Sequence, residues 1–150
     1  MKILVAKDAG YCFGVRDAVN LAKKSGDDFQ EVYMLGDIVH NERVVEDLNK
    51  TGSKVVASLD DIPEDKPVLF RAHGTKPEVW KEAQKKKLNI IDATCPLVTE
   101  IHEEIKMLEN ENRKTIIIGD HGHDEVVGIA AQVKKPIIIS NVKEAEALGR

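Results

Sequence analysis

Short continuous apolar runs alternate with amphipathic stretches along most of the chain. Such runs are typical of buried strands, and we place strands near residues 2–6, 32–35, 54–57, 67–70, 88–91, 114–118 and 136–139. Between the runs, apolar residues recur every three or four positions, which predicts helices near residues 14–25, 41–50, 77–87, 96–111, 125–133 and 142–148. The alternation predicts an α/β fold with mostly parallel sheets flanked by helices.

A division of the chain falls near Pro96. Proline suits the first turn of a helix, and Cys95 then lies just outside that helix. The segment from His40 to Val45 also resembles the segment from His123 to Val127, although shared strand-loop-helix order explains this similarity as well as a repeat does. We expect a first α/β domain over residues 1–95 and an incomplete second one over residues 96–150.

Composition excludes several classes of protein. The chain has 150 residues and a formal net charge of -4, so it has no overall basic field for nucleic acid. No apolar stretch reaches the roughly 20 residues that span a membrane. The chain opens directly on an expected strand with no signal segment, which makes the cytoplasm the expected compartment. Its two cysteines are expected to be free thiols, metal ligands or catalytic groups.

Five expected strand-to-helix junctions each carry a cysteine or a histidine. These residues are Cys12, His40, His73, Cys95 and His123. In a parallel sheet such junctions lie at the carboxyl ends of the strands, where ligands bind. Metal ligands and proton carriers at one sheet edge suggest a reactive site.

Cys12 and Cys95 both precede an expected helix, whose N-terminus favours a thiolate. Each cysteine taken alone could be a small buried apolar residue. Their matched placement favours a role as ligands. Two thiolates complete neither a tetrahedral zinc site nor an iron–sulfur cluster, so further ligands must come from histidines or from elsewhere.

His40, His73 and His123 are each followed closely by an expected helix. Imidazole and unpaired backbone N–H groups could therefore face the same anion, which suits phosphate or diphosphate. A loop side chain bonded to backbone is the alternative for each of them. His102 is expected at the surface, and His121 is a weaker candidate.

Glu125 lies two residues beyond His123, at the start of an expected helix. It could interact only with the helix dipole, or it could deliver protons if it is held close to phosphate or thiolates. We expect ordinary capping or surface roles for Arg71, Lys76 and Asp92, and a packing role for Trp80.

Several segments together resemble one family along the whole chain. They are AGYCFGVRDAV, DIVHNERVVEDL, FRAHGTKPEV, IDATCPLVTEIH and GHDEVVGI. In this order they resemble the amino-terminal part of the LytB/IspH family, the 4-hydroxy-3-methylbut-2-enyl diphosphate reductases of isoprenoid synthesis. The resemblance implies three similar α/β domains around an oxygen-sensitive 4Fe-4S cluster, which three cysteines hold with one iron open to substrate.

The resemblance also implies roles for the site residues. Cys12 and Cys95 would be cluster ligands, His40, His73 and His123 would bind the substrate diphosphate, and Glu125 would relay protons. The implied reaction is reductive dehydroxylation, which gives isopentenyl and dimethylallyl diphosphate with electrons from a ferredoxin- or flavodoxin-type donor.

Two departures from the family pattern qualify these expectations. The chain ends at Arg150, about halfway along a typical member and before the third cysteine and third domain, so we expect it to be inactive without a carboxyl-terminal half. Asp124 stands where proline is common and adds negative charge. The alternatives are a stand-alone Cys/His module that holds zinc without redox turnover, and a folded but inert truncation product.

Overall fold

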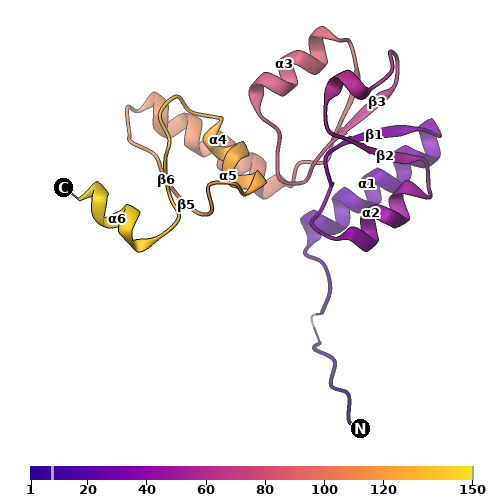
Figure 1. Ribbon diagram of the computed structural model, residues 1–150, viewed down its shortest axis with the longest axis horizontal. Helices are drawn as coiled ribbons and strands as arrows, with labels where there is room; N and C mark the ends of the chain where they lie inside the picture. Colours follow the sequence, from indigo (N-terminus) through magenta and orange to yellow (C-terminus); the bar gives the residue numbers. More distant parts are fainter. Residues whose placement is uncertain (8, 150) are drawn as a thin grey trace.

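The computed structural model describes residues 1–7 and 9–149. Its first sheet has four parallel strands in the order β2-β1-β3-β4 (Figure 1). The strands are β1 (Val32–Leu35), β2 (Ser53–Val56), β3 (Pro67–Phe70) and β4 (Asn89–Asp92). Tyr33 lies opposite both Lys54 of β2 and Val68 of β3, so β1 is an inner strand. β3 is the other inner strand, because it also pairs with β4. The expected parallel α/β arrangement is confirmed.

Helices cover both faces of this sheet. They are α1 (Phe13–Phe29), α2 (Glu42–Asn49), the short 3₁₀ turn η1 (Leu59–Asp61) and α3 (Pro77–Lys85). Met34 packs with Ala22 of α1 on one face, whereas Phe70 packs with Ala83 of α3 on the other. Figure 1 shows α1 and α2 on one side of the strands and α3 on the opposite side. Burial on both faces explains why these strands are continuous apolar runs.

The second unit is smaller. Its parallel strands β5 (Ile116–Ile118) and β6 (Ile137–Ile139) pair with each other, and its helices are α4 (Pro96–Asn110), α5 (Asp124–Ala130) and α6 (Val142–Leu148). Among the described residues each of these two strands has one unpaired edge. Ile118 is 85% exposed, so this unit also leaves part of its apolar surface uncovered.

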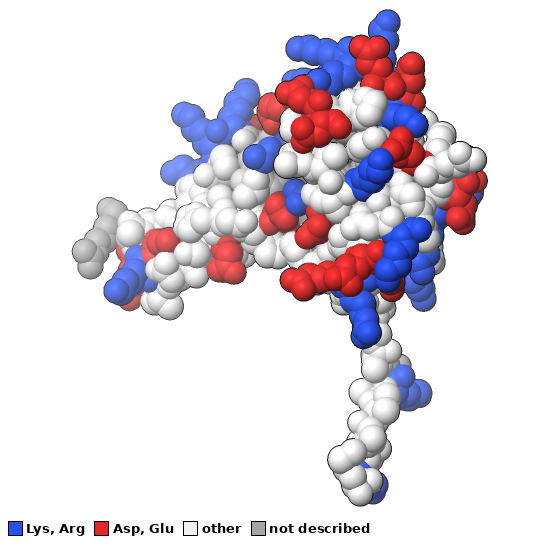
Figure 2. All heavy atoms as spheres, turned by 45° about the vertical axis from the view of Figure 1, so that its right-hand side comes forward, with Lys and Arg blue, Asp and Glu red and all other residues white. Residues whose placement is uncertain are grey.

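The strand expected near residues 2–6 does not form, so that prediction was wrong. Residues 1–7 extend away from the body of the molecule, and Ile3, Leu4 and Val5 are exposed (Figure 1). A strand needs a neighbouring edge for its backbone hydrogen bonds, and neither described sheet pairs with this segment. Figure 2 shows it as a mostly uncharged projection, whereas acidic and basic side chains intermingle over much of the body.

Most other elements agree with the prediction apart from shifted ends. The helix expected over residues 14–25 continues to Phe29, and the Ser25 hydroxyl within it donates to the Leu21 carbonyl at 2.8 Å. The turn η1 was not predicted; Ser58 and Asp61 cap it reciprocally. No helix within the described part of the chain is long and apolar enough to cross a membrane.

Candidate functional site

Backbone hydrogen bonds hold three loops together at the carboxyl edge of the first sheet. The Ala72 N–H donates to the Ile38 carbonyl (3.4 Å), which joins the loops after β3 and β1. The Ala93 N–H donates to Phe70 (3.1 Å) and the Cys95 N–H donates to Ala72 (3.0 Å), which join the loops after β4 and β3. The predicted site residues on these loops are therefore neighbours in space.

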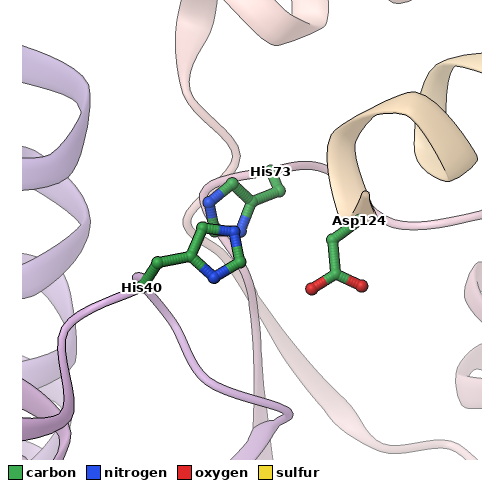
Figure 3. A group of neighbouring side chains, drawn as sticks. All are labelled: His40, His73 and Asp124. Atoms are coloured by element: carbon green, nitrogen blue, oxygen red, sulfur yellow. The ribbon is translucent and has the colours of Figure 1, made fainter. Parts of the chain in front are cut away.

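The three candidate histidines meet at this edge. His40 and His73 stack with their ring centroids 4.2 Å apart. Figure 3 shows the two rings beside each other, facing the Asp124 carboxylate. His123, from the start of α5, lies 5.4 Å from the His40 ring and 6.3 Å from the His73 ring. Residues more than 80 positions apart in the chain thus form one imidazole cluster, which we call the histidine cluster.

His73 is the half-buried member of the histidine cluster. Its pKa is lowered from 6.5 to about 4, first because burial disfavours the charged ring and then because His40 and Arg71 add positive charge. The ring is therefore neutral near pH 7. Its Nδ1 is buried and has no hydrogen-bond partner in the described structure. Water or an ion commonly satisfies such an atom.

His123 is the N-cap of α5. Its Nδ1 accepts a hydrogen bond from the Glu125 backbone N–H at 3.3 Å. A neutral ring that accepts at Nδ1 carries its proton on Nε2, so His123 has a ring N–H available for an acceptor. Glu125 itself is half-buried in the first turn of α5. The structure therefore places Glu125 in the helix turn that His123 caps.

Arg71 and Asp124 join the two units by a bidentate ion pair. The Arg71 Nη1 lies 2.7 Å from Asp124 Oδ2, and Nη2 lies 3.1 Å from Oδ1. One turn further along α5, a Cβ on Gly128 would lie 3.4 Å from the His73 carbonyl oxygen, so this helix packs on the His73 backbone. The expectation of an ordinary capping or surface role for Arg71 was wrong, because its partner lies 53 positions away in the sequence.

Asp124 also approaches the histidines. Its carboxylate and one ring nitrogen each from His40 and His73 all lie within 4.8 Å of one another (Figure 3). Sequence reasoning noted Asp124 only as added negative charge. The signal available was its position immediately after His123.

The two cysteines occupy equivalent positions at helix starts. Cys12 is the N-cap of α1 and Cys95 is the N-cap of α4, and neither forms a side-chain cap hydrogen bond. A Cβ on Gly14 would come within 2.5 Å of the Cys95 Sγ, so the first turn of α1 lies directly against Cys95. Both thiols are free. In residues 1–7 and 9–149, neither joins a three-residue group close enough to hold a metal ion.

His102 is buried, so its expected surface position was wrong. It is 9% exposed and shares one face of α4 with Val98 and Ile105. Gly74 lies against it: a Cβ there would approach the His102 Cε1 to 2.7 Å. Burial lowers the pKa of His102, and the charge of Lys106 lowers it further. The helical spacing of these three residues was the signal that could have placed His102 inside.

The remaining candidates take other roles. Trp80 packs edge-on against Phe70 with ring centroids 4.8 Å apart, which confirms its packing role. His121 is exposed and lies 3.0 Å from a Glu144 oxygen, outside the histidine cluster. Asp92 accepts a hydrogen bond from the Thr94 backbone N–H at 3.0 Å.

The sequence matches the family described as LytB protein over residues 3–150. It is 36% identical over 152 residues to the 4-hydroxy-3-methylbut-2-enyl diphosphate reductase of Anaplasma marginale strain St. Maries, covering 99% of this chain and 44% of that protein. It is 40% identical over 137 residues to the reductase of the same name from Psychromonas ingrahamii, covering 91% of this chain and 44% of that protein. The chain thus spans less than half the length of these curated relatives.

Two solved structures share the fold. The E-1-hydroxy-2-methyl-but-2-enyl-4-diphosphate reductase of Plasmodium falciparum superimposes with a TM-score of 0.90 at 34% identity, covering 93% of this chain and 45% of that one. An (E)-4-hydroxy-3-methyl-but-2-enyl diphosphate reductase, described as the terminal enzyme of the non-mevalonate pathway, superimposes with a TM-score of 0.83 at 36% identity, covering 99% and 54%.

Proposed function

The chain belongs to the LytB protein family, and from this membership we propose that it forms the amino-terminal part of a 4-hydroxy-3-methylbut-2-enyl diphosphate reductase. In this proposal residues 1–95 and 96–150 correspond to a first domain and part of a second. The reaction would be a reductive dehydroxylation that yields isopentenyl and dimethylallyl diphosphate, with a ferredoxin or flavodoxin as the electron donor. The histidine cluster is the single observation that best supports this function.

The histidine cluster suits a diphosphate for three reasons. His123 has a ring N–H available, and the neutral ring of His73 can donate one as well. His40 is exposed, so a ligand can reach it. Several N–H donors that converge from neighbouring loops can bind a phosphate by hydrogen bonding. We therefore assign the diphosphate to His40, His73 and His123.

The cysteines suit a 4Fe-4S cluster as two of its ligands. Both thiols lie at helix N-termini, where the positive end of the helix dipole favours thiolate, and the missing side chain of Gly14 leaves room for the Cys95 sulfur. When bound, the 4Fe-4S cluster would supply electrons and an iron that accepts the substrate hydroxyl. Because this sequence contains only two cysteines, another polypeptide segment must supply the third thiolate.

Glu125 is the proposed proton donor. It is half-buried in the first turn of α5, two residues from the histidine that caps this helix. A carboxyl group beside a bound diphosphate would be placed to pass its proton to a departing hydroxyl.

Pyrophosphate binding tests the proposed function in the chain as it stands. Inorganic pyrophosphate is titrated by calorimetry in a buffer containing a chelator, so that no metal ion contributes. We expect His40→Ala to weaken binding by about 10-fold or more, because it removes a charge-assisted or neutral N–H donor worth about 1.5 kcal/mol. His121→Ala is the matched control, since that histidine is equally exposed but lies outside the cluster. Equal binding by both variants would contradict the assignment.

A further inference from the structure

We propose that His40, His73 and Asp124 form a binding site for a divalent transition-metal ion, with Zn²⁺ as the best-matched ion. The site shares two histidines with the proposed diphosphate site, but the inference rests on the geometry and chemistry of these three side chains alone. It uses no cysteine, so it differs from a Cys/His zinc module and from the iron–sulfur centre.

The three donors converge from separate parts of the fold. His40 precedes α2, His73 follows β3, and Asp124 is the first residue of α5, yet one ligand atom from each lies within 4.8 Å of the other two. Zinc binds nitrogen and carboxylate oxygen at about 2.0–2.2 Å, which places tetrahedral ligands about 3.4 Å apart. The contraction needed is at most about 1.4 Å, which rotations of the His40 and Asp124 side chains can supply.

The donor set is one that divalent metal ions select. Two imidazoles and one carboxylate are the protein ligands of several zinc enzymes and of non-haem iron sites, and they leave at least one coordination position open. The His73 Nδ1 is a buried polar atom without a hydrogen-bond partner in the described structure. A metal ion, or a water molecule that it coordinates, would give this nitrogen a partner.

The ion pair with Arg71 orients Asp124 without exhausting its capacity to bind. Each carboxylate oxygen accepts one hydrogen bond from Arg71, and an ionised carboxylate has about four acceptor positions in all. Carboxylates that bind metals are commonly hydrogen-bonded on their other side, which fixes their direction. The positive charge of Arg71 repels a cation, and the negative charge of Asp124 offsets this repulsion. The site therefore suits an ion that nitrogen ligands bind tightly, not an ion held by charge alone.

The experiment uses the full chain with Cys12→Ser and Cys95→Ser, which removes the thiols that would otherwise bind zinc. Zn²⁺ is titrated by calorimetry, and retained zinc is measured after gel filtration. We expect about one zinc ion per chain, and at least about 10-fold weaker binding after Asp124→Ala. Asp120→Ala is the matched control, because Asp120 lies exposed in the loop just before α5. Failure of the cysteine-free chain to bind zinc, or unchanged binding after Asp124→Ala, would overturn the proposal.

A second readout keeps the test decisive if Asp124→Ala proves unstable. Histidine ring signals in nitrogen-15 NMR spectra are followed as zinc is added to the chain that carries Cys12→Ser and Cys95→Ser and retains Asp124. We expect shifts at His40 and His73 and none at His102, which is buried beneath Gly74. Shifts confined to other histidines would refute the site. The chelated pyrophosphate titration remains independent, so each hypothesis can fail without the other.

Discussion

Gly14 lies so close to Cys95 that a Cβ at position 14 would come within 2.5 Å of the cysteine Sγ. The contact joins the start of α1, where Cys12 is the N-cap, to the start of α4. Close packing against Cys95, and not a turn or a positive φ angle, therefore explains why glycine stands at position 14. The relationship makes Gly14 part of the environment of both cysteines.

Gly14→Ala is expected to destabilise the chain by about 1–3 kcal/mol, because the added methyl group overpacks the contact with the Cys95 sulfur. Equilibrium unfolding in urea measures the change. Gly122→Ala is the control, since a Cβ there would meet no atom within 4 Å. Equal effects at the two positions would show that the Cys95 contact does not limit residue size.

The stability of the chain should fall as the pH drops from 6.5 towards 4. The folded-state pKa of His73 is about 4, below its ordinary value of 6.5. In this window the unfolded state binds the proton more readily, so the contribution of His73 is complete above pH 6.5 and is lost as the pH falls to about 4. Urea unfolding at several pH values should show that the free energy of unfolding depends less steeply on pH in His73→Gln than in the unchanged chain. An unchanged slope in that variant would assign the pH dependence to other groups.

Much of the fold could be predicted because burial on both faces leaves a strong pattern. The run at residues 67–70 becomes β3, whose residues are all buried. The run at residues 2–6 is also largely apolar, but a strand exists only where another strand offers an edge, and local sequence does not carry that information.

The site was predictable in outline but not in its contacts. Strand-to-helix order indicated that His40, His73 and His123 share one sheet edge. The structure brings them together, but His123 follows β5 of the other sheet. The pair Arg71 and Asp124 was missed because it depends on how the second unit packs on the first. No periodicity within either segment encodes that packing.

The 150-residue chain alone should not retain a 4Fe-4S cluster. It offers two cysteine thiolates, and Cys12 is exposed, so iron atoms of a cluster would lack protein ligands and would be open to solvent. Iron and labile sulfide are measured after anaerobic reconstitution and desalting. A monomer that keeps nearly four iron atoms with these cysteines as its only thiols would disprove this expectation.

Glu125→Gln should lower turnover by about 100-fold or more, in a protein completed with the remaining part of a related reductase, because glutamine cannot donate the proton. Substrate affinity should change little, since glutamine keeps the size and hydrogen-bonding capacity of the side chain. Single-turnover reduction by a chemical donor is compared with substrate affinity at matched iron content. Equal losses in both quantities would assign Glu125 to binding.

The packing of α5 on the loop after β3 also imposes an order in time. His40 and His73 lie in the loops after β1 and β3, so they can stack once these two strands have paired. His123 joins them only when α5 packs through Asp124 and Gly128. On a ribosome, the proposed diphosphate site would therefore stay incomplete until the nascent chain has emerged beyond residue 128, after all four strands of the first sheet.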